Sequence, residues 1–144
     1  MKKKQDWISL FDQFILKYYD KPFEWAKWDC CMFSDACIKA MTGESLIPKA
    51  LKWTDEESAL KTIREYGKNL NGSIKKAAQA KKLEKIDPNF MQKGDLCVIK
   101  QETQLCGISD GHKILGPSES GISRIEYKEI NDESWKRLIS LLHS

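Results

Sequence analysis

The sequence predicts an α+β fold, because its first half has the apolar periodicity of helices and its second half has short apolar runs separated by glycine. The pattern changes near Pro88. Residues 1–86 are therefore expected to be mainly helical, and residues 87–144 are expected to form mainly an antiparallel sheet. With 144 residues, of which 41% are hydrophobic, the chain is long enough for one core, so we expect a single domain over residues 1–144.

The first two predicted helices have clear ends in the sequence. Apolar side chains recur at helical spacing over residues 7–19, and Pro22 follows, which does not continue a helix. A second helix is predicted from Cys30, with Asp29 as its N-terminal cap and Gly43 as its C-terminal stop. Its buried face is expected to consist of Phe33, Ala36, Cys37, Ala40 and Met41.

Two further helices are predicted before the sheet half. Thr54 and Glu57 have the spacing of a capping box, so a third helix is expected to start there and run to about Tyr66, with Gly67 ending it. A short, lysine-rich fourth helix is predicted over residues 73–82. These helices complete the helical half.

The second half contains four predicted strands. Asp110 and Gly111 are a strong signal for a tight hairpin between two of them. A loop is expected over residues 116–121. The strands themselves are predicted at residues 96–99, 105–109, 113–115 and 122–127.

The end of the chain fits two structures. Apolar residues from Trp135 to Leu142 keep helical spacing behind a cap at Asn131 or Asp132, which favours a helix. A short edge strand over residues 135–139 is the alternative. We predict the helix.

Composition excludes several classes of protein. Twenty-four basic and 21 acidic residues leave a net charge of +3, too small for a protein that mainly wraps a polyphosphate. Five unevenly spaced cysteines argue against a disulfide framework, and the adjacent pair Cys30 and Cys31 matches no zinc spacing, so no metal and no cofactor is expected. No apolar run has the length of a membrane span or a signal peptide, so we expect no membrane and a reducing compartment.

Cys30 is the candidate nucleophile of this sequence. On the first turn of a helix, its thiol would lie near the positive end of the helix dipole and near free backbone N–H groups, which favour the thiolate and an oxyanion. The alternative is that Cys30 is a small buried residue that only packs. Similarly, Trp25, Trp28 and Trp53 fit either a substrate-binding wall or ordinary packing, and we favour packing.

Four short motifs follow one another along the chain, namely Trp25, Asp29–Cys30 at a helix start, Lys93–Leu96 at a strand start and Gly107–Ile108. In this order they resemble the NlpC-type papain-like cysteine peptidases and amidases. The chain resembles still more closely a family of small phage proteins of unknown function encoded among tail genes. The resemblance covers residues 22–43 and 93–125. It implies a papain-like fold in which the nucleophile helix packs against an antiparallel sheet and a histidine at the start of the second strand is the base.

Both polar partners that the resemblance implies are replaced in this sequence. The histidine position falls on Leu105, and a tyrosine position near the oxyanion site falls on Phe23, which has no hydroxyl. His112, beyond the hairpin, would lie roughly 16 to 20 Å from Leu105, and His143 reaches Cys30 only if the tail folds over the cleft. The resemblance thus implies a degenerate site, with Cys30 as a vestigial nucleophile and binding positions at Phe23, Trp25 and Asp29.

The resemblance to phage tail-gene proteins, with the replaced site residues, implies a structural or assembly protein of a phage tail or baseplate, made in the bacterial host cytoplasm and located in the virion. Its expected partners are other tail proteins of the tail-tip hub, distal tail or tape-measure type. The first alternative is an active cysteine hydrolase of peptidoglycan that uses Cys30 with His112 or His143.

A second alternative is a small nucleic-acid-binding domain. Residues 61–85 contain eight basic and two acidic residues. Few aromatic residues for base stacking lie among them, so we expect a solvated lysine face and no nucleic-acid partner. The lysines that would carry such binding are Lys75, Lys76, Lys81 and Lys82.

Overall fold

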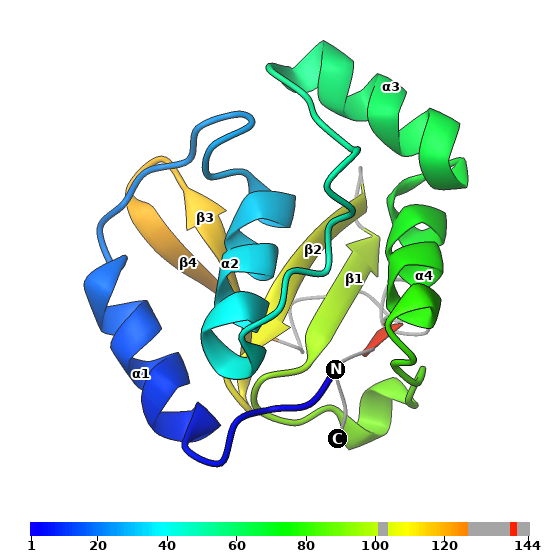
Figure 1. Cartoon of the computed structure of the whole chain (residues 1–144). Helices are drawn as coiled ribbons and strands as arrows, with labels where there is room; N and C mark the ends of the chain where they lie inside the picture. The colour runs from blue at the N-terminus through cyan, green and yellow to red at the C-terminus, as the bar shows by residue number, and fades with distance from the viewer. Residues whose placement is uncertain (101–103, 127–138, 141–144) are drawn as a thin grey trace.

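The computed structural model describes residues 1–100, 104–126 and 139–140. Within these ranges, helices precede a five-stranded antiparallel sheet of order β4-β3-β2-β1-β5 (Figure 1). The predicted α+β class is confirmed. The helices are α1 (Trp7–Lys17), α2 (Cys30–Thr42), α3 (Glu56–Gly67) and α4 (Leu70–Ala80), with a 3₁₀ turn at Pro88–Phe90. The strands are β1 (Leu96–Lys100), β2 (Gln104–Ser109), β3 (Lys113–Ser118), β4 (Gly121–Glu126) and β5 (Ile139–Ser140).

Both predicted ends of α2 are confirmed. The Asp29 side chain accepts a hydrogen bond from the backbone N–H of Met32, which caps the N-terminus. Gly43 ends the helix with φ of 83°, a left-handed conformation that glycine adopts without a Cβ penalty. The predicted buried face is also found in part, since Phe33, Ser34, Cys37, Ile38 and Met41 are buried whereas Ala36 and Ala40 are only half-buried.

The starts of α3 and α4 differ from the predictions. The capping box of α3 joins Asp55 and Ser58 instead of Thr54 and Glu57, because the Asp55 carboxylate accepts from the Ser58 N–H and the Ser58 hydroxyl accepts from the Asp55 N–H. Helix α4 begins at Leu70, three residues before the predicted start. Its cap is Asn69, whose side chain accepts from the backbone N–H of Gly72.

The predicted hairpin at Asp110 and Gly111 is confirmed, and it joins β2 to β3. The predicted loop over 116–121 is mostly strand, because β3 continues to Ser118 and pairs with β4 as far as Ser118 and Gly121. Pro117 is tolerated there because the pairing of β3 with β2 ends at Leu115, so its missing N–H removes no bond to β2.

At the end of the chain, Ile139 and Ser140 form β5, which pairs with Val98 and Cys97 of β1. The predicted helix is therefore wrong at these two residues. Pairing with the edge of β1 satisfies backbone groups that a helix at this place would leave unpaired. The remaining residues of the predicted helix lie outside the described part of the chain.

The sheet has two different faces. On the face toward the helices, β1 and β2 contribute Leu96, Val98, Cys106 and Ile108 to the main core, which also contains Phe33 of α2. Cys97, Ile99 and Ile114 form a separate cluster on the opposite face. This alternation follows from the two-residue period of a strand. Figure 1 shows α2 crossing the helix-facing side of the sheet, with α1 on one side of it and α3 and α4 on the other.

Strands β2 and β3 pair only next to their turn, at Ser109 with Ile114 and Ile108 with Leu115. Beyond these pairs the two strands diverge (Figure 1). The N-terminal end of α2 packs against this region, and it is there that the candidate site lies. None of the helices in the described ranges is long and apolar enough to cross a bilayer.

Candidate functional site

Asp29 fixes the start of α2 by accepting hydrogen bonds from three segments of the chain. Its Oδ1 accepts from the backbone N–H of Met32 at 2.9 Å. Its Oδ2 accepts from the backbone N–H of Ala26 at 2.9 Å and from the indole Nε1 of Trp53 at 2.8 Å. Asp29 is only 2% exposed, so these bonds are shielded from water. The carboxylate thus joins the loop before α2, the helix itself and the segment that leads to α3.

The loop before α2 carries two aromatic residues of the predicted site. The rings of Phe23 and Trp25 contact each other edge to face, with centroids 5.0 Å apart. The backbone N–H of Phe23 donates to the carbonyl of Ser118 at 2.8 Å, which attaches this loop to the end of β3. Trp25 is 39% exposed. The loop therefore presents an aromatic surface beside the N-terminal end of α2.

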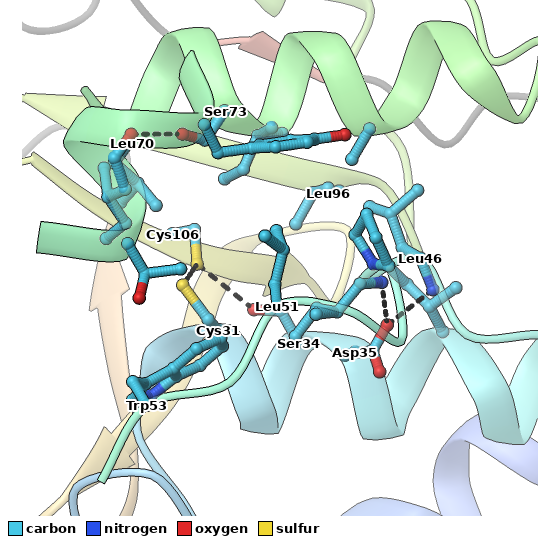
Figure 2. A pocket seen from close by; sticks show the side chains of 18 residues that line it. Cys31, Ser34, Asp35, Leu46, Leu51, Trp53, Leu70, Ser73, Leu96 and Cys106 are labelled. Atoms are coloured by element: carbon cyan, nitrogen blue, oxygen red, sulfur yellow. Dashed lines mark hydrogen bonds between the residues drawn. The ribbon is translucent and has the colours of Figure 1, made fainter. Parts of the chain in front are cut away.

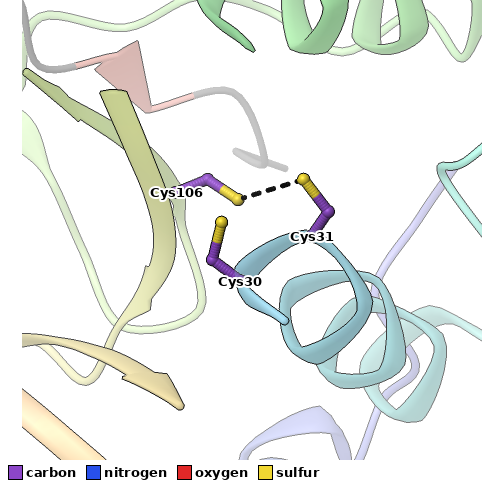
Figure 3. A group of neighbouring side chains, drawn as sticks. All are labelled: Cys30, Cys31 and Cys106. Atoms are coloured by element: carbon purple, nitrogen blue, oxygen red, sulfur yellow. Dashed lines mark hydrogen bonds between the residues drawn. The ribbon is translucent and has the colours of Figure 1, made fainter. Parts of the chain in front are cut away.

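Three thiols meet where the first turn of α2 faces β2 (Figure 3). The sulfur atoms of Cys30, Cys31 and Cys106 all lie within 4.8 Å of one another. The Cys106 thiol donates to the sulfur of Cys31 at 3.9 Å and accepts from the hydroxyl of Ser34 at 3.7 Å. Cys106 is buried, whereas Cys30 and Cys31 are half-buried. We call these three residues the thiol cluster.

The three thiols differ in acidity. Hydrogen bonds from Cys106 and Cys31 hold the pKa of the Cys30 thiol well below its ordinary value. Hydrogen bonds with Cys30 and Cys31 raise the pKa of Cys106, and burial raises it further. The hydrogen bond with Cys106 lowers the pKa of Cys31, but contact with Cys30, burial and the charges of Cys30 and Asp29 outweigh it and raise that pKa. Cys30 is therefore the thiol of the cluster that ionises first.

Cys30 and Cys31 line a cavity of about 670 Å³ at the place where β2 and β3 diverge. A volume of this size is in the range of ligand-binding pockets. The aromatic side chains of Phe23, Trp25 and Trp53 line it together with residues of α3 and of strands β2 to β4. The predicted nucleophile position, the aromatic residues and Asp29 therefore belong to one cavity.

A smaller cavity of about 70 Å³ lies between α2, α3 and α4 (Figure 2). Asp35 holds one of its walls in place, since its Oδ1 accepts from the backbone N–H groups of Leu46 at 2.6 Å and Ile47 at 3.1 Å. Most of the lining side chains are apolar, as in empty cavities of protein cores. We assign this smaller cavity to core packing. Its apolar lining includes Ile38, Leu51, Leu70, Ile74 and Leu96.

Leu105, the position of the histidine in the resembling family, lines the larger cavity but is not a member of the thiol cluster. It pairs with Ile99, which belongs to the cluster on the opposite face of the sheet. Because neighbouring residues of a strand point to opposite faces, the residue that β2 presents to Cys30 is Cys106. A thiol therefore occupies the place next to Cys30 where a base would be needed.

His112 is exposed at the hairpin, where its backbone N–H donates to Oδ1 of Asp110 at 2.8 Å. From Ser109, at the end of β2, to Cys106 is three residues, or about 10 Å along the strand. His112 is thus separated from the thiol cluster, as the sequence predicted. His143 lies outside the described residues.

Sequence reasoning named Cys30, Asp29, Phe23 and Trp25 but missed Cys106 as a member of the site. The alternation of Cys106 and Ile108 with Leu105 and Gly107 was the available signal, because it places Cys106 on the face of the core. The bond from Trp53 to Asp29 spans 24 residues and has no local sequence signal.

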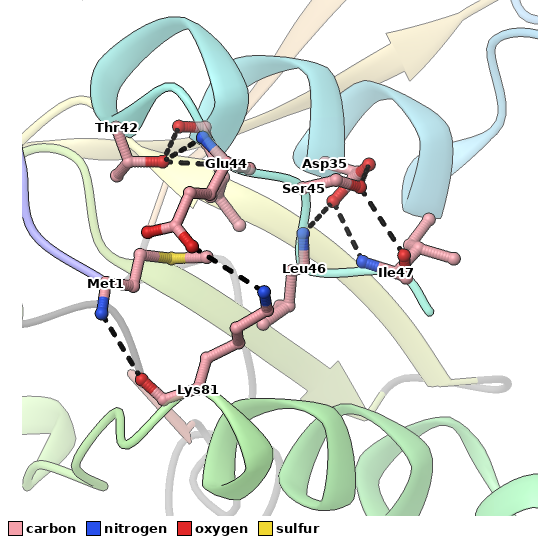
Figure 4. Close-up of polar contacts among 9 residues, drawn as sticks. Met1, Asp35, Thr42, Glu44, Ser45, Leu46, Ile47 and Lys81 are labelled. Carbon is pink, nitrogen blue, oxygen red and sulfur yellow. Dashed lines mark hydrogen bonds and ion pairs between the residues drawn. The ribbon is translucent and has the colours of Figure 1, made fainter. Parts of the chain in front are cut away.

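The lysine-rich region is partly occupied by contacts within the chain. Lys76 donates to the carbonyl of Tyr66 at 3.3 Å and lies over its ring. The Lys81 ammonium pairs with Glu44 at 3.6 Å, and the Lys81 carbonyl accepts from the N-terminal amine of Met1 (Figure 4). Two of the four lysines considered for nucleic-acid binding are therefore engaged with other parts of the protein.

Comparison with known families gives one match. The family described as Domain of unknown function (DUF6950) matches residues 2–136, so the chain belongs to this family. No curated protein matches the chain. The family description assigns no activity, and the chemistry of the site must be argued from its own residues.

Proposed function

We propose that this protein is a structural or assembly component of a phage tail, built on a papain-like, NlpC-type fold whose hydrolytic site is degenerate. The arrangement that supports the fold is the capped helix α2, with Cys30 on its first turn, packed against β2 of an antiparallel sheet. This is the arrangement that the resemblance to NlpC-type proteins implies. The tail location rests on the resemblance to phage tail-gene proteins.

The contact between Cys30 and Cys106 is the observation that best supports the proposed loss of hydrolytic activity. A cysteine hydrolase needs a base within about 3 Å, or one water further, and a base contributes typically about 10²- to 10⁴-fold to the rate. Cys106 is a thiol whose pKa is raised, so it stays protonated and does not take up the proton of Cys30 as a base must. Phe23, at the tyrosine position, offers no hydroxyl to an oxyanion.

A hydrolysis assay tests this part of the proposal. The purified full chain is incubated with peptidoglycan and with soluble stem peptides, and the products are identified by mass spectrometry. We expect no cleavage above the level of the Cys30→Ala variant. Cleavage by the natural chain that Cys30→Ala abolishes would show that the site is not degenerate.

The tail assignment is tested in the phage that encodes the chain. We expect the protein in purified virions, located on the tail by antibody labelling in electron microscopy. Deletion of its gene should leave tails incomplete, and complementation with Cys30→Ala should restore them. A protein absent from virions whose deletion leaves tail assembly unchanged contradicts the assignment.

A second candidate function is an active cysteine hydrolase of peptidoglycan peptides. The observation that favours it is the position of Cys30, which is both on the first turn of α2 and in the wall of the cavity of about 670 Å³. The sequence offers His112 and His143 as bases, and His112 could act only if the hairpin moved, since it is exposed there and separated from the thiol cluster. The assay above decides between the two functions, and Ala substitution of each histidine then identifies the base.

A further inference from the structure

We propose that the thiol cluster of Cys30, Cys31 and Cys106 is a binding site for one thiophilic metal ion of the Zn²⁺ and Cd²⁺ type. The cluster joins two elements that are distant in sequence, since Cys30 and Cys31 open α2 and Cys106 lies in β2. It is the one group of three or more His, Cys, Asp or Glu side chains with metal-binding proximity among the residues that the structure describes. The site is independent of the tail assignment.

The distances fit a shared ion. Zinc–sulfur bonds of about 2.3 Å place two sulfur ligands about 3.8 Å apart in a tetrahedral site and about 4.0 Å apart in a planar three-coordinate site. The Cys31 and Cys106 sulfurs are 3.9 Å apart, and no pair of the three exceeds 4.8 Å. Side-chain rotations that move a sulfur atom by less than about 1 Å therefore bring all three sulfurs to bonding distance from one ion.

The surroundings also suit a thiolate site. Binding of a divalent ion forms three metal–sulfur bonds and releases the three thiol protons to solvent, which leaves one net negative charge on the complex. The N-terminus of α2 carries a positive partial charge of roughly half a unit and offsets part of that charge. The Asp29 carboxylate acts in the opposite direction, but its three hydrogen bonds from Ala26, Met32 and Trp53 stabilise it.

The cavity supplies an entry path and a further ligand position. Cys30, Cys31 and Cys106 all line the cavity of about 670 Å³, so an ion at the cluster borders this space. Three protein ligands with a fourth position for water is the arrangement of open zinc sites. Soft sulfur ligands select thiophilic ions over Mg²⁺ or Ca²⁺.

Metal titration of the full chain tests the proposal. The protein is reduced with a phosphine, freed of metal and titrated with Cd²⁺, whose thiolate charge-transfer band in the ultraviolet reports sulfur coordination. We expect the band to saturate at one Cd²⁺ per chain, and Zn²⁺ to displace it. Cys30→Ser, Cys31→Ser and Cys106→Ser should each weaken binding by more than about 100-fold. Removing a residue that only hydrogen-bonds to a metal ligand already costs about 10- to 100-fold in affinity, and removing the ligand itself costs more.

Matched controls come from the two other cysteines. Cys37 lies in the same helix two turns further on, and Cys97 lies in β1 on the opposite face of the sheet. Cys37→Ala and Cys97→Ala should keep the band and its stoichiometry. Circular dichroism checks the fold of each variant, and testing the half-buried Cys31 beside the buried Cys106 keeps the result informative if one variant does not fold. A reduced natural chain without the band, or equal binding in folded Cys31→Ser or Cys106→Ser, overturns the site.

Discussion

The indole of Trp53 donates a hydrogen bond of 2.8 Å to the buried carboxylate of Asp29, and this bond fastens the segment before α3 to the N-terminus of α2. The same carboxylate caps α2 and holds the loop at Ala26. The Asp29 side chain thus fixes the positions of two walls of the larger cavity, the loop at Ala26 and the segment at Trp53, relative to the thiol cluster.

Replacement of Asp29 should therefore destabilise the protein more than loss of an ordinary cap. Asp29→Ala removes three hydrogen bonds to a charged acceptor, and we expect the free energy of unfolding to fall by about 3 kcal/mol. Trp53→Phe removes one of the bonds and should lower it by about 1 kcal/mol. Urea denaturation measures both values. Equal losses in the two variants contradict the assignment of Asp29 as the shared acceptor.

Gly107 is expected to be intolerant of any side chain. A Cβ at this position would lie 2.5 Å from the carbonyl oxygen of Leu115 and 2.8 Å from a methyl group of Ile114. We expect Gly107→Ala to lower the free energy of unfolding by about 1 to 3 kcal/mol. Gly116→Ala is the matched control, because its Cβ would meet only the Cys106 carbonyl at 4.0 Å. Thermal unfolding that ranks the two variants in the opposite order refutes this interpretation.

The cysteines should react with alkylating reagents in a fixed order. The pKa of Cys30 is lowered by its hydrogen bonds from Cys106 and Cys31, whereas burial raises the pKa of Cys37 and of Cys97. We expect iodoacetamide to modify Cys30 first in the native protein, and Cys37 and Cys97 only after unfolding. Peptide mass spectrometry over a time course gives the order. Modification of Cys37 in the native protein as fast as Cys30 would contradict this predicted order.

The cap of α3 should make part of the stability dependent on pH. Hydrogen bonds from the backbone N–H and the side chain of Ser58 lower the pKa of the Asp55 carboxyl in the folded state. A lowered folded pKa stabilises the protein above the unfolded value, and the contribution is lost as pH falls through the folded pKa. The melting temperature of the natural chain should thus exceed that of Asp55→Asn near neutral pH, and the difference should shrink below about pH 4. A pH-independent difference argues against an ionised cap.

Local signals in the sequence were enough to predict most elements of this fold. Asp29 and Gly43 cap α2 in the structure as the sequence predicted, because helix capping depends on residues close to one another in the chain. The start of α3 differs by one residue because Thr54 and Asp55 are both good caps, and only the folded chain shows that Ser58 bonds to Asp55. The end of β3 was missed because Pro117 usually argues against a strand.

The candidate site was less predictable than the fold. A resemblance in motif placed the base position at Leu105, but a shift of one residue in a strand reverses the face to which a side chain points. The structure brings Cys106 to Cys30 instead, and 75 residues separate Cys31 from Cys106. Spacing rules for metal sites look for nearby ligands, so a cluster assembled by packing a helix on a strand escapes them.

The carboxylate of Asp35 affects the order in which this chain can fold. It accepts hydrogen bonds from Ser45, Leu46 and Ile47, which follow it by only 10 to 12 residues (Figure 4). Closing so short a loop costs little chain entropy, whereas the contact of α2 with β2 must close a loop of more than 70 residues. The segment from α2 to Ile47 can thus become ordered as a local unit before the sheet assembles, and it presents Cys31 to β2 on a surface that is already formed.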